Sequence, residues 1–338
     1  MRQTGNSCLQ PHNVWVNHDV IVVGGSAGAV EVLLGIVAEL PANLHASVFV
    51  VLHTSSADPG LLPELLAARG RLPASFPLHE EKIQRGHIYV APPDNHLLLR
   101  PGAIEVVRGP KENGHRPAVD PLFRTASAAF GPRVIAVVIS GYQDCGTAGM
   151  LSVKARGGLA IVQAPDTALA EEMPRSVVEK VPVDHIVHPL ELPSLIVRLS
   201  ATPAGQAGMP DQFVEQLEGH EKGKPAELVC PICQGVLTEA QPGVFEHFRC
   251  HVGHAFSLES LVSEPGEEME RALWAAVRAL EEGAALSRRL MTSARGDLRR
   301  RFAEKAKTQN EQAELIRQIL LHGALLSRED APSVTDAS

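Results

Sequence analysis

The 338-residue sequence lacks the features by which several classes of protein are recognised. Aromatic residues make up only 4% of it, too few for a surface that stacks the bases of single-stranded nucleic acid. The formal net charge is -8, so the basic excess typical of nucleic-acid-binding proteins is missing as well. It contains no apolar run long enough to span a membrane, and its start has no hydrophobic core of a secretory signal. We therefore expect a cytoplasmic protein that neither binds nucleic acid nor inserts into a membrane.

Cysteine is also scarce, with five residues in the whole chain. A small, odd number of cysteines does not suit a disulfide framework. Cys230, Cys233 and Cys250 lie close together at a spacing typical of metal ligands, whereas Cys8 and Cys145 stand apart. The cysteines therefore indicate a metal site rather than a set of disulfides.

The first 200 or so residues alternate between short Val- and Ile-rich runs and stretches with helical periodicity. This alternation predicts an α/β fold, a doubly wound and mainly parallel sheet with helices on both faces. A local antiparallel excursion is expected between residues 88 and 107. The expected strands lie at 20–23, 47–52, 87–90, 134–139, 159–162 and 185–187, and the expected helices at 29–40, 60–69, 120–130, 149–155 and 174–180.

Changes in composition divide the chain into six segments. Pro, Gly, Ala and charged residues replace the periodic apolar runs after residue 200, which indicates a linker. A turn-rich segment with Cys and His follows, and then two stretches of helical periodicity separated by Gly296. The predicted segments are an N-terminal extension at 1–17, the α/β domain at 18–200, a linker at 201–226, a zinc-ribbon-like module at 227–262, a helical hairpin at 263–324 and a disordered tail at 325–338.

The segment VIVVGGSAGAVE at 20–31 predicts a buried strand, a glycine-rich turn and the start of a helix. In parallel α/β sheets, catalytic groups gather at the carboxyl ends of strands. Ser26 stands in a G-x-S-x-G string at such an end, where backbone N–H groups near Ala27 can stabilise an oxyanion. A glycine turn of this kind also binds dinucleotides, but no Lys-Ser/Thr pair follows it and the next strand ends in a histidine rather than an acidic residue.

Two further strand ends carry groups that can complete a catalytic triad. His53 directly follows the 47–52 strand, and Asp144 lies in the glycine-rich turn after the 134–139 strand. A triad is defined by its geometry and not by the order of its members along the chain. We therefore predict Ser26 as nucleophile, His53 as general base and Asp144 as the orienting carboxylate.

The motifs GGSAGAVE, VLHTSS, GHIYVAPPDNHLLL, HRPAVDPLF, ISGYQDCGTAGM and EEMPRSVV resemble, in content and order, the catalytic domain of chemotaxis-type protein-glutamate methylesterases, the CheB family. The resemblance covers about residues 18–200. It implies a doubly wound α/β fold and a cofactor-free serine esterase, a hydrolase that acts on methylated glutamates of receptor helices in sensory signal transduction. It also implies a role for Tyr142 beside the oxyanion, and for His96, His115, Arg116 and Asp120 in lining or bracing the mouth of the site.

Cys145 departs from the family pattern. The family motif has its catalytic aspartate immediately before the glycine of the D-G-x-A-G segment, and Cys145 stands at that position here. Three interpretations follow: Asp144 substitutes for the missing carboxylate, a Ser26–His53 dyad works slowly, or the domain is a catalytically impaired scaffold for protein interaction or regulation. Cys145 itself is expected to be a small buried thiol rather than the nucleophile.

Cys230-Pro-Ile-Cys233 and Cys250-His-Val-Gly-His254 together have the spacing of a zinc ribbon. Four thiolate or imidazole ligands around Zn²⁺ leave no open position, which predicts a structural metal. The fourth ligand is His254 or His251, and we favour His254 because three intervening residues let the loop turn back. The alternative is a set of reduced cysteines without metal. Acidic surroundings favour a structural or protein-docking role for the module.

The N-terminal segment is short, with about 17 residues before the first expected strand. Ribbon-plus-helix tails similar to this one occur on methylesterase-like proteins that lack the usual receiver domain. We therefore expect regulation, if any, to come from the tail or from a protein that acts in trans.

Overall fold

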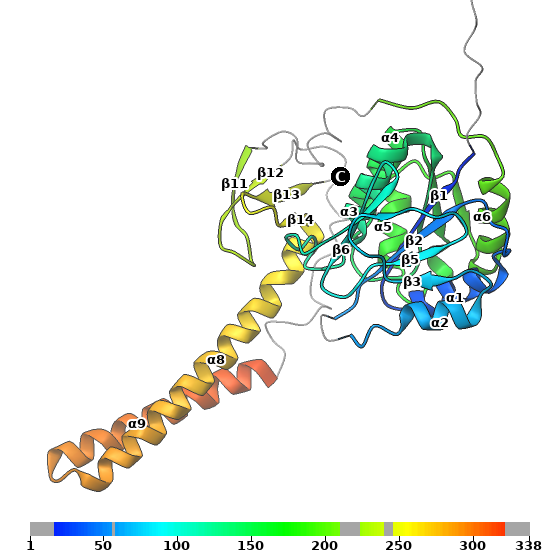
Figure 1. Ribbon diagram of the computed structural model, residues 1–338. Coiled ribbons are helices and arrows are strands. Elements are labelled where there is room, and N and C mark those ends of the chain that lie inside the picture. The colour runs from blue at the N-terminus through cyan, green and yellow to red at the C-terminus, as the bar shows by residue number, and fades with distance from the viewer. Residues whose placement is uncertain (1–16, 56–57, 210–223, 240–245, 322–338) are drawn as a thin grey trace, which may run out of the picture. The chain divides into compact units, whose positions relative to one another are not determined.

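The computed structural model describes residues 17–55, 58–209, 224–239 and 246–321 (Figure 1). The chain divides into two compact units, the first ending at Leu258 and the second beginning at Glu259. The predicted N-terminal extension, apart from Asn17, the predicted tail at 325–338 and residues 210–223 of the predicted linker lie outside the described residues.

A seven-stranded sheet forms the centre of the first unit, and all its neighbouring strands run parallel. The chain adds strands on one side of β1, then returns to place β8 on the other side, so the strand order reverses at β1. Such a reversal opens a crevice at the carboxyl ends of the strands. The order is β10 (His185–Val187), β9 (Leu159–Gln163), β8 (Val134–Val138), β1 (Val20–Gly25), β2 (Ser47–Leu52), β5 (Ile88–Val90) and β3 (Ala74–Ser75).

The central strands are apolar runs because both faces of the sheet are covered. Every residue of β1, β2 and β8 is buried. Successive side chains point to opposite faces, so Val20 and Val22 belong to one core while Ile21 and Val23 belong to the other. This arrangement confirms the predicted α/β fold with a mainly parallel sheet.

Helices cover both faces of the sheet (Figure 1), three on each face among the described residues. Phe123 is typical of the first layer and Leu33 of the second, and both side chains are fully buried. Short 3-10 turns at Gly131–Arg133, Pro165–Thr167 and Pro189–Glu191 connect some of these elements. The first face carries α3 (Val119–Phe130), α4 (Thr147–Ala155) and α5 (Glu172–Lys180), and the second carries α1 (Ala29–Glu39), α2 (Leu62–Arg69) and α6 (Leu192–Ser200).

The predicted antiparallel excursion is smaller than expected. β6 (His96–Arg100) and β7 (Ala103–Val107) form an antiparallel hairpin, and β4 (Glu81–Lys82) pairs with β7. The turn between β6 and β7 contains Gly102 at φ +82°. β5, which the sequence also suggested for this excursion, instead joins the main sheet because its buried residues pair in parallel with β2.

Residues 224–239 and 246–257 contain a separate four-stranded antiparallel sheet in the first unit, called the ribbon sheet below. Its interior contains Leu237, Phe248 and Phe256. The edge strand β14 also pairs with the α/β domain, since Ala255 lies in a β-bridge with Glu112. The strands are β11 (Lys224–Val229), β12 (Val236–Glu239), β13 (His247–Cys250) and β14 (Ala255–Ser257).

The second unit contains two long helices, α8 (Leu258–Ser293) and α9 (Asp297–Leu321). Gly296, at φ +59°, lies in the turn between them. Ser287 donates a hydrogen bond to Gln309, and Arg317 pairs with Glu281, so the two helices contact each other through polar side chains as well as buried alanines. Within the described part of the chain, no helix combines the length and apolarity that crossing a membrane requires.

The same substitution at two helical glycines should change stability in opposite directions. A Cβ at Gly35 of α1 meets no atom within 4 Å, so Gly35→Ala should raise the free energy of unfolding by about 0.5–1 kcal/mol. A Cβ at Gly149 of α4 would lie 2.6 Å from the Phe123 Cβ, so Gly149→Ala should lower it by about 1–3 kcal/mol. Urea unfolding followed by circular dichroism measures both changes, and equal midpoints would contradict the close α3–α4 packing.

Candidate functional site

Ser26 and His53 line one cavity of about 440 Å³ at the carboxyl ends of β1 and β2. The two residues come from neighbouring strands whose last paired positions are Gly25 and Leu52. Apolar side chains form one wall of the cavity, while Thr54 and Asp58 add polar groups. The wall consists of Val30 from α1 and of Leu61, Leu62 and Leu65 at the start of α2. The predicted nucleophile and base therefore share one accessible space.

The backbone around Ser26 is fixed from two sides. The Ser26 N–H donates to the Ser140 carbonyl at 2.9 Å, and the Ser26 carbonyl accepts from the Ala29 N–H at 3.1 Å, where α1 begins. Gly28 adopts φ +76°, a conformation that glycine tolerates best. A Cβ at Gly141 would lie 2.9 Å from the Ser26 Cβ, so the loop after β8 presses directly against the serine.

His53 lies with its ring buried against a second histidine. Its backbone N–H donates to the Gly25 carbonyl at 3.1 Å, which fixes the residue beside β1. Its ring stacks on that of His115, with centroids 3.7 Å apart and planes 17° from parallel. Neither ring nitrogen has a hydrogen-bond partner among the described residues, Ser26 included. Catalytic hydrogen bonds often form only when substrate is bound, so the missing hydrogen bond between Ser26 and His53 does not exclude His53 as a general base.

The environment of His53 keeps its imidazole neutral. Burial, followed by the neighbouring charge of His115, lowers the pKa of His53 well below its ordinary value. Burial and the Lys111 cation lower the pKa of His115 to about 4. A neutral imidazole has a free lone pair near pH 7, which is the state that a general base requires.

Asp144 does not orient His53, which corrects the prediction from sequence. The Asp144 carboxylate is buried and accepts a hydrogen bond from the Ser257 hydroxyl at 2.6 Å, and the Lys180 ammonium lies 3.9 Å away. The predicted hydrogen bond to His53 is therefore missing from the described residues. The physical reason is local, because Asp144 lies one residue before the position the family uses, in a turn where its carbonyl accepts from the Thr147 N–H at 3.1 Å and its carboxylate contacts Ser257.

Cys145 is a buried thiol in the core beneath the site. Its side chain is fully buried, and its sulfur accepts a hydrogen bond from the Val119 N–H at 3.3 Å. Burial, followed by the charge of Asp120, raises the pKa of Cys145 well above its ordinary value. The sulfur therefore stays protonated, whereas a cysteine nucleophile must be a thiolate.

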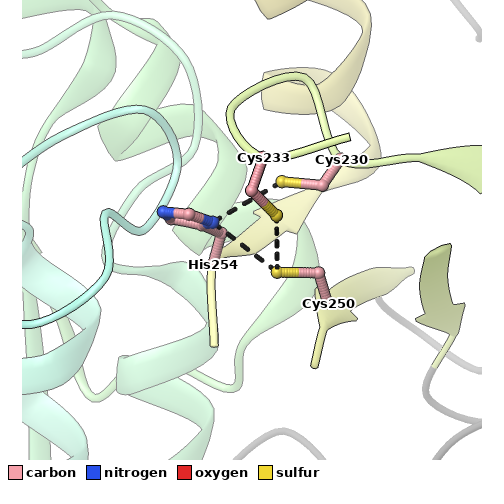
Figure 2. Close-up of side chains that lie close together, drawn as sticks. All are labelled: Cys230, Cys233, Cys250 and His254. Atoms are coloured by element: carbon pink, nitrogen blue, oxygen red, sulfur yellow. Dashed lines mark hydrogen bonds between the residues drawn. The ribbon is translucent and has the colours of Figure 1, made fainter. Parts of the chain in front are cut away.

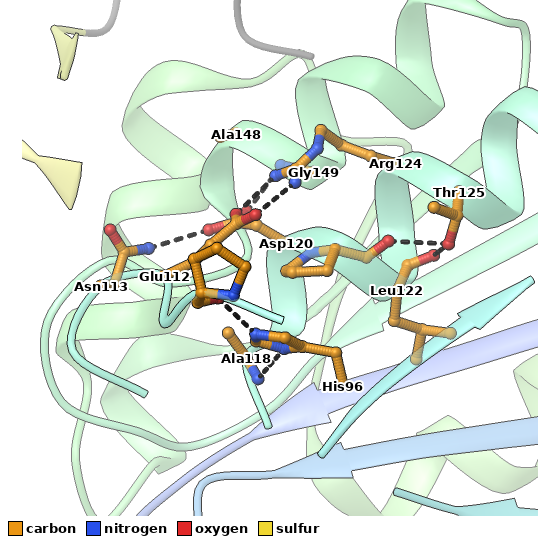
Figure 3. Close-up of polar contacts among 12 residues, drawn as sticks. His96, Glu112, Asn113, Ala118, Asp120, Leu122, Arg124, Thr125, Ala148 and Gly149 are labelled. Atoms are coloured by element: carbon orange, nitrogen blue, oxygen red, sulfur yellow. Dashed lines mark hydrogen bonds and ion pairs between the residues drawn. The ribbon is translucent and has the colours of Figure 1, made fainter. Parts of the chain in front are cut away.

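His96 and Asp120 brace the loops around the site rather than line the cavity (Figure 3). His96 donates from Nε2 to the Pro110 carbonyl at 2.8 Å and accepts at Nδ1 from the Ala118 N–H at 3.3 Å. One oxygen of Asp120 accepts from the Gly146 and Gly149 N–H groups, and the other accepts from Asn113 at 2.9 Å. Asp120 thus ties the segment before α3 to the start of α4.

The turn that carries His115 is held by charged side chains. Glu112 and His115 pair backbone to backbone, and the buried Glu112 carboxylate receives two hydrogen bonds from Arg124 at 2.7 and 2.8 Å (Figure 3). Burial alone would raise the pKa of Glu112, but the Arg124 guanidinium outweighs it and lowers the pKa to about 2. Arg116 donates to Asp94 and to the Gly109 carbonyl. These contacts fix the imidazole that lies against His53.

The two groups predicted beside the oxyanion lie in the loops that surround Ser26. The Ala27 carbonyl accepts a hydrogen bond from the Ser140 hydroxyl at 2.7 Å, so the turn after Ser26 is tied to the loop after β8. Tyr142 lies in that second loop with 47% of its surface exposed. An oxyanion contact by either residue stays a prediction.

The four residues predicted as metal ligands form a cluster in the ribbon sheet (Figure 2). The sulfur atoms of Cys230 and Cys250 each lie 3.6 Å from the His254 Nδ1, and the sulfur atoms of Cys233 and Cys250 lie 3.6 Å apart. His251 lies outside this cluster, with its ring beside Gly235. The structure thus gathers His254 with the three cysteines, as the sequence favoured.

Three features of the site were not predicted from the sequence. The stacking of His115 on His53 and the hydrogen bond between Ser257 and Asp144 join residues far apart in the chain. The apolar wall from α2 carried a weak signal, because Leu61 and Leu65 are four residues apart on a helix and exposed by 57% and 49%. Apolar residues at that spacing on an exposed face can indicate a binding surface.

Comparisons with known proteins match the α/β domain. The family model described as CheB methylesterase matches residues 21–196. A putative protein-glutamate methylesterase/protein-glutamine glutaminase of Leptospira interrogans is 32% identical over 185 residues, 54% of this chain and 96% of that protein. The protein-glutamate methylesterase/protein-glutamine glutaminase of Pyrococcus abyssi is 31% identical over 182 residues. The match covers 53% of this chain and 50% of the Pyrococcus protein.

A solved structure gives the same correspondence in space. The crystal structure of the Thermotoga maritima CheB methylesterase catalytic domain matches with a TM-score of 0.52 and 29% identity. The match covers 54% of this chain and 100% of that one. The residues matched by the family model end at 196, before the ribbon sheet begins at Lys224.

The buried histidine pair should make the protein less stable in mild acid. The folded His115 stays neutral down to about pH 4, whereas an unfolded histidine binds a proton near pH 6.5. Stability is then full above pH 6.5 and is lost as the pH falls from 6.5 towards 4. At pH 5 the loss due to His115 is about 1–2 kcal/mol. Urea unfolding at pH 7 and pH 5 measures the loss in the free energy of unfolding. This loss should be smaller in His115→Gln than in the wild type, and unchanged in His45→Gln, a control at an exposed position. The same loss in His115→Gln and in the wild type would contradict the burial argument.

Proposed function

Because the chain belongs to the CheB methylesterase family, we propose that it is a serine esterase that hydrolyses glutamate methyl esters on chemoreceptors or related sensory proteins. The observation that carries the proposal is the cavity shared by Ser26 and His53. The names of the two relatives also include protein-glutamine glutaminase, and the same acyl chemistry would release ammonia from an amide. We place the reaction in the cytoplasm, where a cluster of cysteines remains reduced.

The mechanism is acyl transfer through an enzyme ester. The Ser26 hydroxyl oxygen attacks the ester carbonyl carbon while His53 takes the hydroxyl proton. Backbone N–H groups at the turn around Ala27 stabilise the oxyanion. The protonated His53 then returns the proton to the leaving oxygen, and methanol departs. Water, deprotonated by His53, hydrolyses the acyl-enzyme to glutamate and regenerates Ser26.

This reaction depends on a dyad rather than a triad. Cys145 stands at the family's aspartate position, and Asp144 is bonded to Ser257, so no carboxylate in the described part of the chain forms a hydrogen bond that would fix the tautomer of His53 or stabilise its protonated form. Loss of the orienting aspartate in a serine protease lowers kcat by about 10⁴-fold. The lowered pKa of His53 also makes it a weaker base. We therefore expect slow turnover.

The shape of the cavity suits an ester on a protein surface. Val30, Leu61 and Leu65 are 40%, 57% and 49% exposed, so the wall offers apolar contact both to the methyl group and to the flank of a substrate helix. A partner protein that acts in trans could regulate access to this wall. The chemistry proposed uses only a hydroxyl, an imidazole and backbone amides.

A second candidate function is a protein-interaction or regulatory scaffold derived from an esterase. The observation that favours it is the buried imidazole of His53, which has no hydrogen-bond partner among the described residues and no orienting carboxylate. Such a domain would still bind a methylated or unmethylated receptor helix against the same wall, but without turnover.

Removal of the Ser26 hydroxyl should abolish hydrolysis, because no other group in the mechanism supplies the nucleophile. Methanol release from a methylated receptor fragment should fall to background in Ser26→Ala. Ser194→Ala, at an exposed position on α6, is the matched control and should keep wild-type activity. Methanol release that is unchanged in Ser26→Ala would eliminate the serine mechanism, and absence of release from the wild type would favour the scaffold.

A carboxylate restored at position 145 should raise the rate. Cys145→Asp places an acid at the position the family uses, and we expect an increase of about tenfold or more in labelling of Ser26 by a fluorophosphonate. Cys145→Ser, which adds no charge, is the control. Circular dichroism identifies a variant that fails to fold, because the new carboxylate would be buried beside Asp120. A folded Cys145→Asp protein with no gain would show that the missing carboxylate does not limit the reaction.

A further inference from the structure

The cluster of Cys230, Cys233, Cys250 and His254 has the dimensions of a tetrahedral zinc site. Zn–S bonds of about 2.3 Å and Zn–N bonds of about 2.0–2.1 Å place neighbouring ligand atoms about 3.5–3.8 Å apart. Three separations in the cluster are 3.6 Å, and all four ligand atoms lie within 4.8 Å of one another. The chain therefore presents these atoms at metal-binding distance without further rearrangement.

Two turns of the ribbon sheet supply the ligands in pairs. The Gln234 N–H donates to the Cys230 carbonyl at 2.8 Å, and the Gly253 N–H donates to the Cys250 carbonyl at 3.0 Å. The pairing of Leu237 with Cys250 joins the two turns across β12 and β13. Three thiolates and one imidazole are soft ligands that favour Zn²⁺ over Ca²⁺ or Mg²⁺, and four protein ligands leave no position for a reactive water.

The strand that follows the fourth ligand contacts the α/β domain. β14 begins at Ala255, directly after His254. The Ala255 carbonyl accepts from the Asn113 N–H at 2.8 Å, and the Ser257 N–H donates to the Asn113 side-chain oxygen at 2.9 Å. The hydrogen bond from Ser257 to Asp144 completes the contact. Every one of these groups is buried, so the contact excludes water.

The Asn113 contact leads to the base of the proposed reaction. Asn113 lies in the turn between Glu112 and His115, which are paired by two backbone hydrogen bonds of 3.2 and 2.9 Å. His115 in turn stacks on His53 at 3.7 Å. An unbroken series of contacts thus joins the metal ligand His254, through β14 and the 112–115 turn, to the ring of His53.

We propose that Cys230, Cys233, Cys250 and His254 bind one Zn²⁺, and that the bound ion holds β14 against the 112–115 turn and so fixes the histidine pair of the esterase site. Zinc in small ribbon modules supplies much of their folding free energy, so loss of the ion should release β14. The family match ends at residue 196, so the ribbon sheet lies outside the matched residues and would brace them from the following part of the chain. The zinc site and the brace do not depend on the proposed function.

Metal content tests the site. The full chain, purified without chelator, should contain about one zinc per chain by mass spectrometric elemental analysis. His254→Ala should lose most of this zinc, and His251→Ala, at the neighbouring histidine outside the cluster, should keep it. A wild-type chain without zinc that also fails to take up added Zn²⁺ would overturn the proposal, and so would loss of zinc in His251→Ala but not in His254→Ala.

Hydrogen exchange tests the brace without using activity. In the full chain, the N–H of Asn113 donates to Ala255, so removal of zinc by a chelator should speed its exchange by about tenfold or more, while amides of β1 keep their rates. Readdition of Zn²⁺ should restore the protection. His254→Ala should show the fast exchange without chelator, and His251→Ala should not. Zinc binding with unchanged exchange at Asn113 would overturn the brace and leave the esterase proposal standing.

Discussion

The register of three parallel strands places the groups of the candidate site at one edge of the sheet. β1 pairs with β2 and β8 so that Gly25 lies level with Leu52, and Gly24 with Val138. The chain therefore leaves all three strands at the same edge, and Ser26, His53 and the loop from Ser140 to Gly146 meet there. Buried apolar runs on both faces hold this register, because a shift by one residue would exchange the two cores.

The same geometry explains why one changed residue alters the chemistry of the site. Cys145 faces the core, where its sulfur accepts from Val119, and Asp144 faces the ribbon strand that ends in Ser257. The Asp144 carboxylate, one position before Cys145, therefore forms no hydrogen bond with the His53 imidazole and instead accepts one from Ser257. The loop therefore affects two regions: it leaves His53, the proposed base, without an orienting acid among the described residues, and it gives the ribbon sheet a buried acceptor in Asp144.

The sequence was sufficient where a feature repeats locally or has a fixed spacing. Apolar periodicity predicted the strands of the main sheet apart from β3, and the helices α1 to α5, but not α6 or the two-residue strands β3 and β4. The cluster of three cysteines with His254 follows from the spacing of its residues. Contacts such as Ser257 to Asp144, or His115 to His53, carry no comparable signal, because they depend on how two segments far apart in the chain dock. The position of β5 in the main sheet was hard to predict for the same reason, since a three-residue apolar run does not specify its partner strand.

The buried ring nitrogens of His53 reduce the stability of the fold, because they have no hydrogen-bond partner among the described residues. Two buried ring nitrogens without partners among the described residues cost about 1–3 kcal/mol each, unless a bound substrate or water meets them. The ring cannot escape this cost by turning outwards, because His115 stacks on it and the 112–115 turn is held by Arg124 on one side and β14 on the other. Support from two directions thus holds in place an imidazole whose buried nitrogens have no hydrogen-bond partner among the described residues, and β14 of the ribbon sheet supplies one of those supports. Such a brace matters most where the described residues offer His53 no orienting carboxylate, since packing then does part of the positioning that a hydrogen bond to an acid would do.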